Sequence, residues 1–311
     1  MIKPSLFIAA LLALALQLAP AEAQTLSRTY VSAALGSDAN NCDRTTPCRT
    51  FQHAHDNTLA AGEITVLDPG GYGAVTIAKA ISIINDGVGE AGVLVSGGGT
   101  AITVMANAGD AVSLRGLTIK GIGFGGGNGI VFNTGKSLVV EYCAIRNLDT
   151  AGYGAVFFYP STTSSLAISN TVVSDNSDGI SFSPQLSASA SGALDHVAMH
   201  NNGGTGLFVA GGSTTGTSKV VVTDSIADNN VQGFAVSNKS MLTVLRSVAA
   251  NNQVGLSAGF AGGQMAVAQS MVTGNVNGWQ AVAGGVIVSY GDNMVDANGG
   301  SQGAMPVIGK K

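Results

Sequence analysis

The sequence predicts an all-β fold, a parallel β-helix in which each coil of the chain contributes three short strands. A glycine that precedes an apolar pair recurs in steps of 22 to 27 residues, and an asparagine stands three or four residues before five of these glycines. Repeats of similar length in this range are typical of solenoids. The glycines are Gly129, Gly154, Gly179, Gly206, Gly233, Gly255 and Gly278.

Each repeat contains three segments rich in valine, isoleucine, threonine and serine, as in LAISN, TVVS and GISFS within residues 166–183. These residue types favour strands. The repeats lack the leucine framework of leucine-rich repeats and the long runs of helix formers of helical repeats. Three strands in a coil of this length indicate a parallel β-helix.

A column of asparagines is expected in the bend between two strands of successive coils. Equivalent residues of neighbouring coils lie about 4.8 Å apart. Asparagine offers two donors and an acceptor, and it tolerates the left-handed backbone conformation of a bend. Stacked asparagines therefore satisfy backbone groups that the bend would leave unpaired. The predicted ladder consists of Asn176, Asn202, Asn230, Asn252 and Asn275.

The N-terminal segment has the features of a secretory signal peptide. Lys3 precedes an apolar run over residues 6–18, and AEA at residues 21–23 is a small-x-small cleavage signal. The run is too short for a membrane-spanning helix, and no later stretch is long and apolar enough. We therefore exclude residues 1–23 from the fold and expect cleavage near Ala23, with the mature protein periplasmic or extracellular.

Residues 24–61 are expected to form an N-terminal cap. Cys42 and Cys48 stand close together in an exported chain, so a disulfide between them is expected. Cys143 remains as a third cysteine and is interpreted as a buried, unreactive thiol.

A short helix is expected to close the first coil. Thr50 is expected to cap a helix from Phe51 to about Ala61, ended by Gly62. The apolar face of this helix would cover the end of the solenoid core.

The β-helix itself is expected over residues 62–300, followed by a C-terminal tail over 301–311. No second helix is predicted at the C-terminal end. Solenoid ends need a cover, so the tail or a partner is expected there, and self-association through this end is one possibility.

Composition excludes two classes of partner. Charged residues make up 10% of the chain and the formal net charge is −4, so a nucleic acid or an anionic membrane is not expected. No metal site is predicted either. His53 and His55 diverge on a helix, and His196 and His200 lie about 13 Å apart in a strand. No cofactor is evident.

Overlaying the repeats reveals a polar column that follows each first strand. His196, Asp224 and Arg246 would stack on three consecutive coils. Such a set could orient a catalytic base beside a sugar ring and neutralise a carboxylate. The alternative is structural, because strand ends need polar residues and opposite charges on adjacent coils attract. The column reads Gly116, Tyr142, Asn170, His196, Asp224, Arg246 and Gln269.

The segment AGYGAVFFYP, residues 151–160, contains a cluster of four aromatic residues. Strand alternation places one or two of them in the core. The remainder could form a platform on which a sugar ring stacks, for which we name Tyr153, Phe158 and Tyr159; the alternative is a packed loop.

The repeats over residues 62–300 resemble the right-handed parallel β-helix proteins of the pectin-lyase-like superfamily. The segment over residues 30–56 also resembles the entry segment of exported bacterial β-helix proteins. The resemblance implies a right-handed coil, a polysaccharide ligand and, for a lyase, calcium. In LDHVAMH, residues 194–200, Asp195 and His196 match the Ile-Asp-His segment of pectate lyases, but Ala193 replaces the preceding tryptophan.

Other family signatures are absent. The sequence has no arginine-rich lyase segment and neither the paired aspartates nor the Gly-His-Gly motif of polygalacturonases. We therefore expect an exported β-helix protein that binds or processes an extracellular polysaccharide, with binding favoured over catalysis. The alternatives are a noncatalytic, adhesin-like rod and a polysaccharide lyase; any enzyme activity would be that of a lyase or a glycoside hydrolase.

Overall fold

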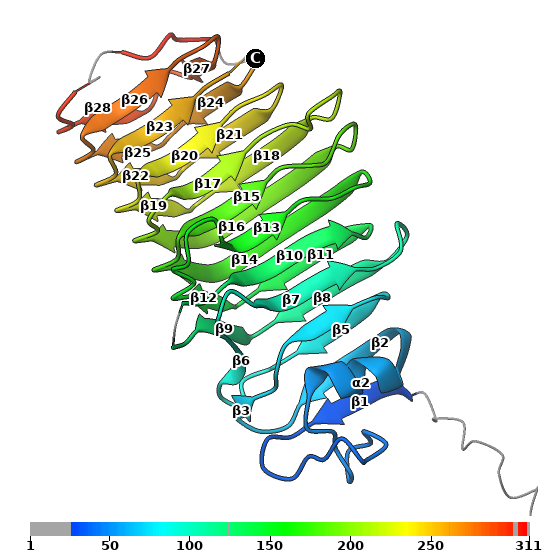
Figure 1. The fold of residues 1–311 in the computed structure, drawn as a ribbon. Helices are drawn as coiled ribbons and strands as arrows, with labels where there is room; N and C mark the ends of the chain where they lie inside the picture. Colours follow the sequence, from blue (N-terminus) through cyan, green and yellow to red (C-terminus); the bar gives the residue numbers. More distant parts are fainter. Residues whose placement is uncertain (1–25, 124, 261, 301–303, 310–311) are drawn as a thin grey trace, which may run out of the picture.

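The computed structural model describes residues 26–123, 125–260, 262–300 and 304–309. The predicted signal peptide, residues 1–23, lies outside the described residues, as do residues 301–303 and 310–311 of the predicted tail. The chain winds into an elongated stack of coils in which all strand pairs are parallel (Figure 1). The predicted parallel β-helix is confirmed.

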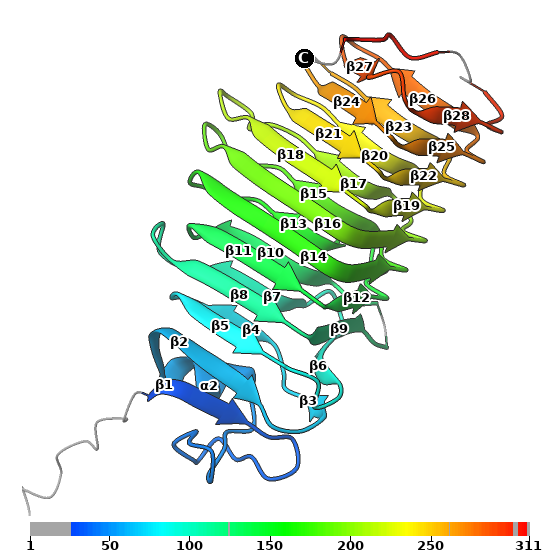
Figure 2. The same ribbon diagram turned by 180° about the vertical axis from the view of Figure 1, so that it is seen from behind.

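Each complete coil contributes to three ladders, and the short strands of the second ladder lie along one edge of the stack (Figure 2). The first ladder contains β1 (Leu26–Val31), β2 (Thr58–Val66), β5 (Ile81–Ile84), β8 (Ala111–Arg115), β11 (Ser137–Glu141), β14 (Ser164–Ser174), β16 (Ala190–His200), β18 (Ser218–Thr223), β21 (Met241–Leu245), β24 (Gln264–Ala268) and β27 (Val286–Ser289). The second ladder contains the C-terminal parts of β14 and β16 together with β3 (Gly70–Gly71), β6 (Ala91–Val95), β9 (Leu117–Gly121), β12 (Ala144–Arg146), β19 (Ile226–Asp228), β22 (Val248–Ala250), β25 (Met271–Thr273) and β28 (Met294–Asp296).

The third ladder is a separate sheet. It contains β4 (Val75–Ile77), β7 (Thr100–Met105), β10 (Asn128–Thr134), β13 (Gly154–Phe158), β15 (Asp178–Phe182), β17 (Thr205–Val209), β20 (Gln232–Val236), β23 (Val254–Ala258) and β26 (Asn277–Ala281). We call the bend between the first and second ladders the first corner and the bend between the second and third ladders the second corner.

The core is a column of inward-facing apolar side chains that runs the length of the stack. Its largest members include Phe132, Phe158 and Phe182, which come from three consecutive coils. Their ring centroids are 4.6 Å and 5.4 Å apart. Cys143 is also buried, and burial raises the pKa of its thiol to about 11. The thiol therefore stays protonated and unreactive at neutral pH.

The capping helix α2 (Phe51–Asn57) is present, and the Thr50 hydroxyl accepts a hydrogen bond from the His53 N–H at its start. The prediction that it extends to Ala61 was wrong. The backbone becomes extended at Thr58 because residues 58–66 form β2, which pairs with β1 and β5. Tertiary pairing thus overrides the local helix preference of the alanines.

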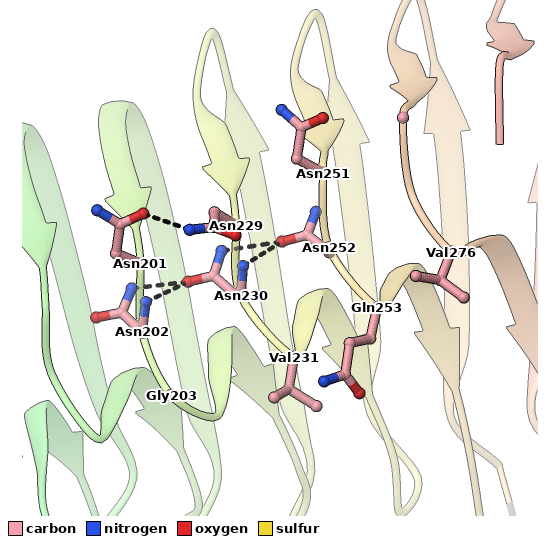
Figure 3. A pocket seen from close by; sticks show the side chains of 11 residues that line it. Asn201, Asn202, Gly203, Asn229, Asn230, Val231, Asn251, Asn252, Gln253 and Val276 are labelled. Carbon is pink, nitrogen blue, oxygen red and sulfur yellow. Dashed lines mark hydrogen bonds between the residues drawn. The ribbon is translucent and has the colours of Figure 1, made fainter. Parts of the chain in front are cut away.

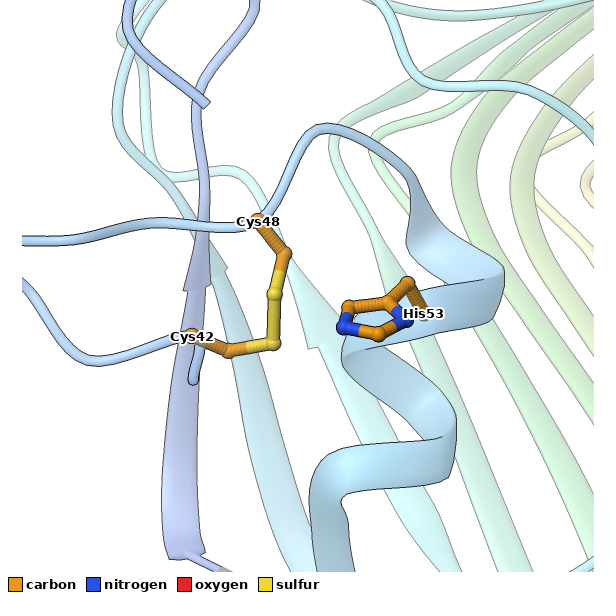
Figure 4. Close-up of side chains that lie close together, drawn as sticks. All are labelled: Cys42, Cys48 and His53. Atoms are coloured by element: carbon orange, nitrogen blue, oxygen red, sulfur yellow. A yellow bond between two sulfur atoms is a disulfide. The ribbon is translucent and has the colours of Figure 1, made fainter. Parts of the chain in front are cut away.

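A disulfide joins Cys42 and Cys48 within the cap, and the His53 ring lies beside it (Figure 4). Tyr30 of β1 holds this loop through two backbone hydrogen bonds, to Cys42 and from Cys48. The bridge therefore fastens the loop to the first strand of the solenoid.

At the other end, the described part of the tail lies beside β27. Val307 pairs with Ser289, and the Met305 side chain is buried. No helix in the described part of the chain is long and apolar enough to cross a membrane.

The repeated glycine at the second position of most third-ladder strands has a steric cause. A Cβ atom on Gly233 would lie 2.6 Å from the Gly255 carbonyl oxygen and 2.9 Å from Nδ2 of Asn252. Coils can approach to their normal spacing here only because this position has no side chain.

Candidate functional site

The predicted polar column lies at the first corner. The paired strands align Leu194, Val222 and Val244 as assumed from the sequence. Every residue of the column has a positive φ, for example 53° at His196 and 49° at Asp224. The left-handed conformation turns the chain at this point, so these side chains leave the sheet instead of entering the core.

The structure brings His196, Asp224 and Arg246 close together. Arg246 donates two hydrogen bonds to Asp224, with Nε–Oδ1 and Nη2–Oδ2 distances of 2.9 Å and 2.7 Å. Nδ1 of His196 lies 2.8 Å from Oδ2 of Asp195, the preceding residue. Oδ1 of Asp195 accepts a hydrogen bond of 2.6 Å from the Thr223 hydroxyl. The charged groups are therefore already engaged with one another.

The ion pairs set the protonation of this cluster. The Arg246 guanidinium lowers the pKa of Asp224, and the Thr223 hydroxyl, followed by His196, lowers the pKa of Asp195. The Asp195 carboxylate in turn raises the pKa of His196. All of these groups are exposed to solvent, so each pair contributes little to stability. With this raised pKa, a smaller fraction of the His196 imidazole is neutral at neutral pH than in a free histidine.

We expect His196 to titrate above its ordinary value of 6.5 in the folded protein. The stabilising effect of the His196–Asp195 pair is present below the pKa of the unfolded chain and is lost as pH rises through the folded pKa. An NMR titration of the imidazole resonances measures this. Asp195→Asn should lower the pKa of His196, and a wild-type pKa at or below 6.5 would contradict the pairing.

The same cluster brings three potential metal ligands together. Ligand atoms of Asp195, His196 and Asp224 lie within 4.8 Å of one another. Calcium takes about six to eight oxygen ligands, whereas this cluster offers two carboxylates whose oxygens already accept hydrogen bonds from Arg246 and Thr223. The cluster does not fit calcium.

The predicted aromatic platform needs correction. Phe158 is fully buried between Phe132 and Phe182, so the prediction that it binds a ligand was wrong. The alternation of β13 turns Phe158 inward and Phe157 outward. Tyr153 precedes β13 and Tyr159 follows it, which separates them by about 20 Å along an extended strand. These two tyrosines therefore do not form one surface.

The buried asparagine ladder lies at the second corner, beside a groove of 370 Å³ that is also lined by the outer neighbours Asn201, Asn229 and Asn251 (Figure 3). In each described step, the side-chain carbonyl of one asparagine accepts two hydrogen bonds from the asparagine one coil earlier, one from its backbone N–H and one from its side-chain amide. Asn230, for example, accepts these two hydrogen bonds from Asn202 at 3.0 Å and 2.9 Å. The ladder extends to Asn298, which the sequence analysis missed. The outer neighbours Asn201 and Asn229 also bond to each other. This groove is thus built of side chains that stabilise the bend.

The first corner contains a column of hydrogen-bonded serines that was not predicted from the sequence. The hydroxyl of Ser247 accepts from the Ser225 N–H and donates to the carbonyl of Leu245, and Ser270 repeats the pattern one coil later. The signal was present in the sequence, because a serine follows Asp224, Arg246 and Gln269 directly.

The outer face of the first ladder carries a shallow hollow of 330 Å³, which we call the first-ladder hollow. Its floor is formed by small outward side chains of β11, β14 and β16 at equivalent positions in three coils. The side chains that line it include Ser137, Val139, Ser165, Ala167, Ser191, Ala193 and Lys219. A row of three serine hydroxyls and the Lys219 side chain thus border the hollow, next to the polar column that contains His196.

Comparisons with known proteins agree with this architecture. The chain matches the family model described as right handed beta helix region over residues 70–215 and 100–298. It is similar to the structure of pectate lyase Pel9A, with 16% identity and a TM-score of 0.61, over 84% of this chain and 74% of that chain. It is also similar to XylC in complex with xylose, with 9% identity and a TM-score of 0.55, over 82% and 69% of the two chains. A search of curated proteins found no match. At these identities the likeness concerns the fold, and the predicted right-handed coil is confirmed.

Proposed function

The chain belongs to the right-handed β-helix family, and from that premise we propose that it is an exported protein that binds an extracellular polysaccharide along the first ladder without cleaving it. The first-ladder hollow is the observation that carries this proposal. The names of the two similar structures, a pectate lyase and a complex with xylose, also point to carbohydrates.

The chemistry of the hollow suits a chain of sugars. Serine hydroxyls can donate to and accept from sugar hydroxyls, and Ala167 and Ala193 leave room for a ring to lie close to the sheet. Serines occupy the same position in three consecutive coils, about 4.8 Å apart, and Lys219 occupies it in the next coil. An extended polymer lying along the solenoid axis would therefore meet similar groups at regular intervals.

Binding is favoured over catalysis because His196, Asp224 and Arg246 of the polar column beside the hollow already have charged partners. Removal of a proton next to a uronate requires an available base and a cation that can stabilise the new charge. Nδ1 of His196 is paired with Asp195, and the Nε–Nη2 edge of the Arg246 guanidinium is occupied by Asp224. This arrangement supports a role in positioning the corner.

We expect a double variant, Ala167→Leu with Ala193→Leu, to lower polysaccharide affinity at least tenfold, because the added side chains fill the hollow. Affinity is measured by sedimentation with insoluble polysaccharides and by a soluble glycan array. Ala144→Leu, an equivalent change on the second ladder, is the matched control and should bind normally.

Two further readouts test the rest of the proposal. A lyase absorbance assay with and without calcium should give no product, and product formation would reject the noncatalytic role. If no polysaccharide binds the wild-type protein, the structural rod becomes the preferred function. Export is checked by N-terminal sequencing of the protein recovered outside the cytoplasm, which should begin near Gln24.

A further inference from the structure

The outer face of the third ladder carries a second hollow, of 390 Å³, between two phenylalanine side chains. Phe157 of β13, Ser181 of β15 and Phe208 of β17 occupy equivalent outward positions in three consecutive coils. Both rings are half-buried against the sheet. We call the space between them the third-ladder slot.

The spacing of the phenylalanine rings in the core can be compared with the width of this slot. Behind the same sheet, Phe132, Phe158 and Phe182 fill three consecutive coils with three rings, spaced 4.6 Å and 5.4 Å apart. On the outer face Ser181 stands where a middle ring would be, and Phe157 and Phe208 are two coils apart, about 9.6 Å. The separation between them thus matches the thickness of one additional ring with normal contacts on both sides.

Polar side chains lie on both sides of Ser181 along the chain, at Asp178 and at Ser183. At one end, Oδ1 of Asp178 accepts a hydrogen bond of 3.1 Å from the Thr205 N–H. A Cβ atom on Gly204 would lie 2.0 Å from this oxygen, so the glycine makes room for the carboxylate. At the other end, the hydroxyls of Ser181 and Ser183 are 3.2 Å apart. The slot therefore combines two apolar walls with a fixed carboxylate and two hydroxyls.

We propose that the third-ladder slot binds a neutral sugar ring. The C–H faces of a pyranose would pack against the two phenylalanine rings, and its hydroxyls would donate to Asp178 and exchange hydrogen bonds with Ser181 and Ser183. Asp178 is the one charged residue among the side chains that line the slot. A uronic acid would place a second carboxylate beside it without a cation to compensate, which is unfavourable. The slot lies on a different ladder from the first-ladder hollow and extends the proposed function to a second surface.

The test uses the mature protein and soluble oligosaccharides of glucose, xylose, mannose and galactose, with oligosaccharides of the corresponding uronic acids for comparison. Affinity is measured by calorimetry and ligand-observed NMR. At least one neutral series should bind, and the uronic acid series should bind at least tenfold more weakly.

Three variants examine the walls and the carboxylate. Phe208→Ala should lower affinity about tenfold or more. Ser181→Phe should abolish binding because the added ring fills the slot. The added ring also completes the outer row of phenylalanines, so this variant should stay folded and its loss of binding would not be due to unfolding. Asp178→Asn should weaken binding of the neutral series and reduce the discrimination against uronic acids.

The outcomes separate this slot from the first-ladder hollow. In a protein that already carries Ala167→Leu and Ala193→Leu, which fill the first-ladder hollow, the remaining oligosaccharide binding should be abolished by Ser181→Phe. The slot is rejected if Ser181→Phe and Phe208→Ala bind like the wild type, if uronic acids bind as well as neutral sugars, or if no oligosaccharide binds. Sugar binding that is lost in the variant with Ala167→Leu and Ala193→Leu, and that is unaffected by Ser181→Phe and by Phe208→Ala, would uphold the proposed function and reject the slot.

Discussion

Replacing Phe158 by alanine is expected to lower the free energy of unfolding by about 4 kcal/mol. The side chain is fully buried between Phe132 and Phe182, and its removal leaves a cavity that rigid neighbouring coils cannot fill. Coils contact only their neighbours, so the damage should spread from β13 to the adjacent coils first. Chemical denaturation measures the loss, and hydrogen exchange locates it.

Phe157→Ala is the matched control for this prediction. Phe157 is the same residue type in the preceding position of the same strand, but it faces outward and lines the third-ladder slot. Its replacement should change stability by less than about 1 kcal/mol. Equal losses for the two variants would show that the inward and outward assignment of β13 is wrong. A stable Phe157→Ala protein also allows its sugar binding to be compared directly with that of the wild type.

The pair also illustrates what the sequence can and cannot predict. The same residue type recurs wherever the same bend recurs. The asparagine column can therefore be recognised from the sequence, because an asparagine stands at a constant place in each repeat. Phe157, Phe158 and Tyr159 are consecutive aromatics, and local pattern alone does not decide which of them faces the core. Only the pairing of β13 with β10 and β15 fixes that choice.

The two hollows depend even more strongly on register. Phe157 and Phe208 are two coils apart, the coils differ in length, and the two side chains come to line one space only after every coil is aligned. The charged column at the first corner was located from the sequence, since its residues follow the strand anchors at constant spacing. The chemical role of this column could not be predicted from the sequence, because that role depends on the bidentate contact between Arg246 and Asp224.

Replacing Asn230 by alanine is expected to lower the free energy of unfolding by about 4 kcal/mol, because several buried polar groups lose their partners at once. The Asn230 side chain accepts hydrogen bonds from the backbone and the side chain of Asn202. It donates to the carbonyl of Met199 in the previous coil and to the side chain of Asn252 in the next. Water cannot replace these bonds easily, since the residue is almost completely buried. Thermal and denaturant unfolding measure the loss.

The adjacent Asn229 provides the control. It has the same side chain but lies on the outside of the corner with φ at 55°, and Asn229→Gly keeps this backbone conformation accessible. Its side chain makes one hydrogen bond, to Asn201, so the loss should stay near 1 kcal/mol. Hydrogen exchange in the Asn230→Ala protein should increase first at the second corner of the coils that contain Asn202 and Asn252. Exchange that rises evenly over all coils, or an equal loss in Asn229→Gly, would mean that the buried amides do not hold neighbouring coils together.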